Sequence, residues 1–283
     1  MLSSATSLVR GHHTLPWQIA TSSLRVTPVL MLVLLLVLTM SLPACSDPAP
    51  VPFAKLFEAE VAVPENVAET IRAIAAWKRT QPGERYYLHH TFKRPAERAE
   101  EYASSGLKVR SNPPLTVTPP IDWAANPGQD NNWLYQKNAT YVLMPFLQLL
   151  QQGDAGQLDV AQAVLLDWIE YHERHDNPFQ WYDMGAGIRA TNLALVLDHA
   201  LRREPLDLLA LERLLRAAHD HARELGDPSK LAPGNHAYFQ LLGIKALCRS
   251  VSVLEVCGAL DPYASEEMSK LVMSQFTAEG VQR

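Results

Sequence analysis

Gly234-Asn-His-Ala-Tyr-Phe-Gln-Leu-Leu-Gly-Ile-Lys-Ala-Leu247 is the stretch that decides the fold of this chain. The residues before it, 227–234, are rich in Pro, Gly, Ser and Asp, which is typical of a loop. Within it, apolar residues recur at helical spacing over a wide face, which predicts a largely buried helix. We therefore expect Asn235 at the N-cap and His236 at the first helical position.

The start of this helix has chemical consequences. A helix N-terminus carries unpaired amide donors and partial positive charge, which attract an anionic group. The same field disfavours an imidazolium, so His236 is expected to stay neutral and able to accept a proton. The local alternative is that Asn235 only caps the helix and His236 lies on the surface.

The remainder of the chain is also patterned for helices. Strand patterning is almost absent, so the expected fold class is all-α, built from antiparallel helix pairs. Periodicity alone leaves a bundle, a superhelix of repeats and a toroid open. Gly226 is placed to end one helix, and Pro145 to kink another. Helices are expected at about 65–79, 133–152, 158–175, 184–202, 206–225 and 262–276.

Composition excludes some functions and leaves others open. The chain has 283 residues, ordinary hydrophobic content and a formal net charge of -5, which gives no support for nucleic-acid binding. After Cys45 only Cys248 and Cys257 remain, and either a disulfide or two buried thiols fits them. No His/Cys spacing accompanies them, so we expect no metal site and no cofactor.

Residues 1–45 have the pattern of an export signal. An apolar run at 29–40 follows Arg10 and Arg25, and it is short for a transmembrane helix but suited to a signal sequence. Leu42-Pro-Ala-Cys45 resembles a bacterial lipobox, in which Cys45 would be lipidated. The expectation is an exported protein, periplasmic or an outer-membrane lipoprotein, tethered by the Pro-rich residues 46–64 ahead of a helical domain at 65–283. Simple cleavage near Ala44 and an uncleaved anchor are the alternatives.

The stretch quoted first resembles the Asn-His helix of the heparinase II/III-like polysaccharide lyases. Other stretches resemble parts of that family in the same order along the chain. They are Ile121-Asp-Trp123 with Asn131-Asn-Trp133-Leu-Tyr135-Gln136, then Trp181-Tyr-Asp183-Met-Gly-Ala-Gly-Ile-Arg189-Ala, and finally Gln275-Phe-Thr-Ala-Glu279-Gly-Val-Gln-Arg283. The resemblance covers roughly residues 110 to 283.

This resemblance implies an incomplete (α/α) toroid, without the β-sandwich domain that follows in the family. It also implies β-elimination on uronic-acid polysaccharides, in which the uronate carboxylate is neutralised, a base takes the C5 proton and an acid protonates the leaving oxygen. Asn235 would bind the carboxylate, and His236 would act as second donor or base. Trp133, Trp181, Tyr182 and Arg189 would contact the substrate.

The same resemblance implies a gap. The family's acid tyrosine lies in a Glu-x-Ser-Pro-x-Tyr-His motif that would begin where this chain stops, at Arg283. The expectation is therefore the N-terminal part of a lyase, inactive as it stands. Alternatives are a lipid-anchored helical module that binds acidic glycans without cleaving them, and an all-α envelope interaction protein. For Arg189 a helix salt bridge, and for Trp181 a place in the core, are the structural alternatives.

Overall fold

The computed structural model describes residues 52–57 and 66–275, and in these residues the fold is all-helical. Extended pairing there is limited to two isolated bridges, Phe57 with Leu254 and Leu107 with Leu115. The all-α prediction is confirmed. The main helices are α2 (Val67–Thr80), α3 (Pro95–Ser105), α4 (Asn131–Asn138), α5 (Met144–Gln151), α6 (Leu158–His172), α7 (Asp183–Arg202), α8 (Leu208–Leu225), α9 (Asn235–Ser250) and α10 (Cys257–Gln275), with short 3₁₀ turns η1 (Phe53–Leu56), η2 (Tyr141–Leu143), η3 (Ala155–Gln157) and η4 (Pro228–Lys230).

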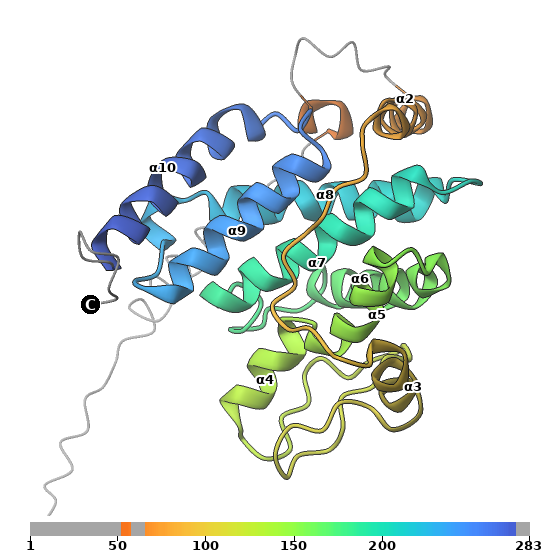
Figure 1. Cartoon of the computed structure of the whole chain (residues 1–283), viewed down its shortest axis with the longest axis vertical. Coiled ribbons are helices and arrows are strands. Elements are labelled where there is room, and N and C mark those ends of the chain that lie inside the picture. Colours follow the sequence, from red (N-terminus) through yellow and green to blue (C-terminus); the bar gives the residue numbers. More distant parts are fainter. Residues whose placement is uncertain (1–51, 58–65, 276–283) are drawn as a thin grey trace, which may run out of the picture. The chain divides into compact units, whose positions relative to one another are not determined.

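The core of the domain is a pair of helices, α7 and α9, that lie side by side and run in the same direction (Figure 1). Their first turns meet where His236 contacts Asp183, and their later turns meet where the Ser250 hydroxyl donates to the Ala194 carbonyl. Glycine makes the close approach possible, because a Cβ on Gly187 would lie 2.3 Å from the Phe239 carbonyl oxygen. α9 is therefore central to the domain, as its apolar face predicted.

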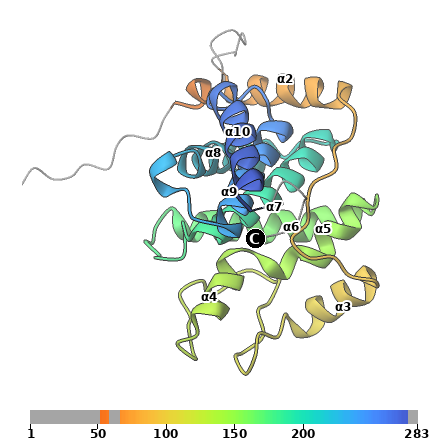
Figure 2. The same cartoon turned by 60° about the vertical axis from the view of Figure 1, so that its left-hand side comes forward.

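The connecting helices pack around this pair. α8 returns the chain between α7 and α9 and contacts both, and α2 packs against α7 and α8 (Figure 2). α8 ends at Gly226, as predicted, and α2 is capped by Asn66, whose side chain accepts from the Ala68 amide. No helix in the described residues is long and apolar enough to cross a membrane.

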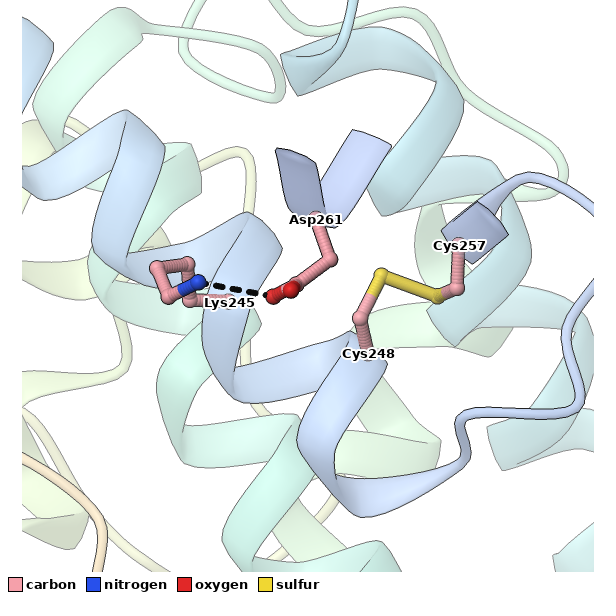
Figure 3. The surroundings of a disulfide bond; sticks show 4 residues. All are labelled: Lys245, Cys248, Cys257 and Asp261. Atoms are coloured by element: carbon pink, nitrogen blue, oxygen red, sulfur yellow. Dashed lines mark hydrogen bonds and ion pairs between the residues drawn. A yellow bond between two sulfur atoms is a disulfide. The ribbon is translucent and has the colours of Figure 1, made fainter. Parts of the chain in front are cut away.

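α10 is fastened to α9 covalently. A disulfide joins Cys248 to Cys257, and Lys245 forms an ion pair with Asp261 at 2.8 Å close to it (Figure 3). Of the two possibilities left by the sequence, the disulfide is the one observed. α10 begins at Cys257 rather than at Pro262, so the expected start was five residues late.

Another expectation about the helices was wrong. The segment 133–152 is not one helix kinked at Pro145, because Thr140 adopts a left-handed conformation (φ 54°) and separates α4 from η2 and α5. Pro145 instead lies in the first turn of α5, where its missing amide hydrogen costs no helical bond. The charged segment around Lys93 continues into α3, whose residues are mostly exposed.

The N-terminal boundary of the domain also differs from the prediction. Phe53, Leu56 and Phe57 are buried in the hydrophobic core, and the Glu255 amide donates to the Leu56 carbonyl. This part of the predicted tether is therefore packed against the domain. The predicted leader and Cys45 lie outside the described residues, as do residues 276–283 at the end of the last motif.

Candidate functional site

A cleft of about 370 Å³ opens at the first turns of α4, α7 and α9, which is the size of a small-molecule site. Aromatic and amide side chains dominate its wall. The lining residues are Asn131, Asn132, Tyr135, Phe179, Tyr182, Met184 and His236. Two of the residues predicted from sequence, Tyr182 and His236, therefore meet at this cleft although they are far apart along the chain.

His236 is oriented by a carboxylate of the neighbouring helix. Its Nδ1 lies 3.0 Å from Oδ2 of Asp183, and both side chains are about one-third exposed. Because a carboxylate only accepts, the hydrogen belongs on Nδ1 when the ring is neutral. Nε2 is then the nitrogen that can accept a proton from a molecule in the cleft.

The cap of α9 is one residue earlier than predicted. Gly234 occupies it with φ 66° and ψ -140°, a conformation that glycine adopts readily, so Asn235 is the first helical residue and His236 the second. Asn235 is exposed beside His236. Its amide is therefore not used as the cap, and Asn235 is next to the lining residue His236 without lining the cleft itself.

Aromatic rings form one continuous wall of the cleft. The Tyr182 side chain is exposed, and its ring lies 5.7 Å from that of Tyr135, 5.6 Å from Phe179 and 6.5 Å from His236 between centroids. Rings spaced in this way offer flat apolar faces beside a polar rim. Such a wall suits the stacking of a sugar ring.

Sequence reasoning missed a tyrosine pair, one member of which, Tyr135, lines the cleft. The hydroxyls of Tyr135 and Tyr141 are 3.1 Å apart, and Tyr141 packs edge-on against His89 at 5.0 Å. Burial raises the pKa of both tyrosines, and the shared hydrogen bond adds to the rise for Tyr135. Both tyrosines are therefore protonated at neutral pH. Burial also lowers the pKa of the neighbouring His89.

Arg189 lies in the core and does not line the cleft as expected. Its side chain has no exposed surface. Nε donates to Nε2 of His221 at 2.9 Å, Nη1 to the Asn138 carbonyl at 2.6 Å, and Nη2 to the Gln180 carbonyl. The guanidinium also stacks on Trp168, 3.8 Å from the ring centre. These contacts tie α7 to α4, α6 and α8, so here the side chain has a structural role.

The two tryptophans predicted to contact substrate are also held by the protein itself. Trp133 is buried, and its Nε1 donates to the Pro113 carbonyl at 3.0 Å. Trp181 is half-buried and packs edge-on against His221 at 4.9 Å. Of the substrate-contacting set, only Tyr182 lies on the cleft wall.

The histidines at the end of α6 pack on aromatic rings. His172 is buried and stacks on Trp168 at 4.1 Å. His175 is exposed and stacks on Tyr171 at 4.4 Å. No group of three or more metal-ligating side chains occurs in the described ranges 52–57 and 66–275.

The architecture defines an all-α protein of the (α/α) toroid type, in which α7 and α9 run in one direction and α8 returns between them. No protein-family model matches the chain, and no curated protein resembles it in sequence. Two crystal structures of the heparan sulfate lyase HepC from Pedobacter heparinus, one of them a mutant, are similar in fold, with TM-scores of 0.63 and 0.62.

The likeness to HepC is distant. Sequence identity is 15%, and the similarity covers 81% of this chain and 40% of the HepC chain. At that identity the likeness shows a polysaccharide-lyase-like fold and nothing finer. The chain spans about 40% of the structures it resembles.

Proposed function

We propose that this chain is the helical, glycan-binding part of an exported lyase-like protein, and that uronic-acid-containing polysaccharide binds in the cleft between α4, α7 and α9. The observation that carries the proposal is the His236–Asp183 pair at the mouth of an aromatic cleft. The fold shared with a heparan sulfate lyase supports the same class of ligand.

The residues of the cleft fit the chemistry of a uronate. A sugar ring would stack on Tyr182, with the exposed amide of Asn235 and the N-terminus of α9 facing its carboxylate. Nε2 of His236 would then stand near the C5 proton as the base for elimination, held in that orientation by Asp183. Binding is the activity that the described residues support most directly, whereas elimination also needs an acid.

The disulfide supports the proposed export. Disulfides persist in oxidising compartments such as the bacterial periplasm and are rare in the cytosol. The bond between Cys248 and Cys257 is consistent with that setting. The leader at 1–45, the tether that follows it and lipidation of Cys45 remain predictions, which mass spectrometry of the mature N-terminus would test.

Binding is tested with the purified full chain and a panel of glycans. Titration calorimetry with alginate, heparan sulfate and chondroitin oligosaccharides is compared with a neutral dextran of matched length. We expect an acidic glycan to bind, and His236→Ala and Tyr182→Ala each to weaken binding about tenfold, ~1.4 kcal/mol. His175→Ala is the matched control, because it removes an exposed ring outside the cleft lining.

Equal binding of dextran and acidic glycans, or unchanged affinity in both cleft variants, would refute the proposed site. Absence of any glycan binding by folded protein would leave an envelope interaction protein as the better description.

A further inference from the structure

The segment that joins α2 to α3, residues 81–94, is an irregular strap that α5 holds at two points (Figure 1, orange-to-gold trace). The side chain of Gln151 accepts from the Tyr86 amide at 2.7 Å and donates to the Tyr86 carbonyl at 3.0 Å. Gln148 holds the amide and carbonyl of Phe92 at the same distances. The backbone between Tyr86 and Phe92 is therefore fixed by two clamps.

The clamped strap holds one aromatic ring at the surface. Tyr86 and Leu88 are buried, whereas Tyr87 between them is 49% exposed. The Tyr87 ring lies against Phe239 of α9, with 6.2 Å between ring centroids. An exposed ring on a fixed backbone loses little conformational freedom when a ligand stacks on it, so little affinity is lost to ordering.

Tyr87 belongs to a cluster of rings that we call the strap patch: Tyr87 and His89 from the strap, Tyr141 from η2 and Phe239 from α9. The last three are partly exposed. His89 packs edge-on against Phe239 at 4.8 Å and against Tyr141 at 5.0 Å. Contiguous exposed rings of this kind mark a binding surface more often than scattered ones do.

The strap patch adjoins the cleft at two places. The Tyr141 ring lies 5.7 Å from that of Tyr135, which lines the cleft. Phe239 comes three residues after the lining residue His236 on α9, and residues at this spacing are neighbours on a helix surface. A linear polymer that extends from the cleft over either contact meets the strap patch.

Polar groups on the strap suit an acidic glycan. Neither ring nitrogen of His89 has a hydrogen-bond partner in the described part of the chain, and only Nδ1 is buried, so Nε2 can meet a sugar hydroxyl. Arg85 and Lys93 are exposed near the two ends of the strap, and neither forms an ion pair within residues 52–57 and 66–275. These two positive charges are therefore available to an anionic chain.

We propose that the strap patch is a second sugar subsite, where a further unit of the glycan chain held in the cleft stacks on Tyr87. The inference rests on the proposed function and adds to it the length of glycan that the protein recognises. An aromatic face contacts the C–H groups of a sugar whatever its charge pattern, so this subsite favours long chains over short ones.

The test compares two lengths of one acidic glycan on the purified full chain. A disaccharide and a hexasaccharide of the glycan that binds most tightly are titrated by calorimetry. We expect wild type to bind the hexasaccharide about tenfold more tightly, because two subsites act on one molecule. Tyr87→Ala should weaken hexasaccharide binding about fivefold, since a stacking contact is lost. It should leave disaccharide affinity within about twofold, because that ligand is held in the cleft.

Other variants separate the two subsites. His236→Ala should weaken both lengths by the same factor, because it changes the cleft that both ligands share. Tyr87→Phe keeps the ring and should keep the wild-type preference for the longer chain. Leu209→Ala is the matched control, because it removes a 71% exposed apolar side chain from α8. Unfolding curves establish that each variant is folded.

Equal affinity of wild type for both lengths would overturn this inference and leave the cleft standing. A loss in Tyr87→Ala that is equal for both lengths, or no loss, would also overturn it. Sedimentation of wild type and Tyr87→Ala checks the other occupant of such a patch, a second copy of the chain. A dimer that Tyr87→Ala abolishes, with the length preference unchanged, would make the patch an interface between copies instead. No binding of either length by folded wild type would overturn the proposed function as well.

Discussion

Two histidines are each bonded to a charged residue of α7, but they differ in how many of their ring nitrogens the protein uses. His221 accepts from Nε of Arg189 at its Nε2, and its Nδ1 lies 2.7 Å from the Ala217 carbonyl, so both ring nitrogens are used inside the core. His236 bonds Asp183 through Nδ1, and its Nε2 has no partner among the described residues. One ring is fully occupied by the structure, and the other keeps a nitrogen for a ligand.

The two partners differ in charge and in their position along α7. Asp183 starts the helix and faces the cleft, whereas Arg189 lies two turns on and is surrounded by α4, α6 and α8. Burial and Arg189 hold the pKa of His221 well below its ordinary value. A polar motif with aromatic neighbours is therefore evidence of a functional site only where a titratable atom remains unpaired and accessible.

The largest expected effect comes from removing the buried charge. Arg189→Met keeps much of the volume but leaves His221 and two backbone carbonyls without their donor. We expect a loss of about 3–5 kcal/mol in the free energy of unfolding, because each unsatisfied buried group costs ~1–3 kcal/mol. Urea unfolding measures it. A loss below about 1 kcal/mol would mean that the network is not structural and that Arg189 is free to serve the cleft.

Removing the disulfide tests whether the cleft, at the first turn of α9, depends on the last turn of that helix. Cysteines nine residues apart close a short loop, and breaking the bond with Cys248→Ser/Cys257→Ser should cost about 2–3 kcal/mol. Glycan affinity at a temperature where the protein stays folded should not change, because His236 lies at the opposite end of that helix. Reductant should lower the Tm of wild type and leave the double variant unaffected. Weaker glycan binding by the folded variant would show that the two ends are coupled.

Lowering the pH should reduce the stability of the buried core more than it affects the cleft. Burial lowers the pKa of His172 to about 4 and that of His221 in the same direction. A histidine whose pKa is lower in the folded state favours folding above its ordinary pKa and loses that contribution as the pH falls towards the folded value. His172 alone should lower the unfolding free energy by about 2 kcal/mol between pH 7 and pH 5. Chemical denaturation at several pH values measures the slope, which should flatten in His172→Phe. An equal slope in wild type and variant would contradict this assignment.

Much of the fold follows from the sequence because helical periodicity reports burial directly. The apolar stripes predicted α7 and α8 within a few residues. The glycine cap at Gly234 was misplaced because a positive φ is not visible in a pattern of polar residues. Arg189 was misplaced for another reason. Sequence patterns cannot distinguish a guanidinium that faces solvent from one whose three acceptors come from two helices and a loop.

The wrong prediction of one helix hid the contact between Tyr135 and Tyr141. A continuous helix over 133–152 would put residues six positions apart on faces that differ by about 120°. Their hydroxyls would then point apart. The left-handed Thr140 breaks the helix and brings the two oxygens within 3.1 Å. The only signal in the sequence is two tyrosines on either side of Asn-Ala-Thr, a run with weak helical propensity at its ends.

The smallest expected effect on stability comes from a residue of the proposed binding site. His236→Ala removes one hydrogen bond from a partly exposed pair at a helix end, so we expect the unfolding free energy to change by no more than about 0.5 kcal/mol. Glycan affinity should still fall about tenfold. His221→Ala should do the reverse, with a large loss of stability because Arg189 would lack an acceptor in the core. If both variants lose stability equally, the contrast between the two histidines fails. If His236→Ala is stable and binds glycan with normal affinity, Nε2 of His236 does not contact the ligand. The cleft would then not be the glycan-binding site.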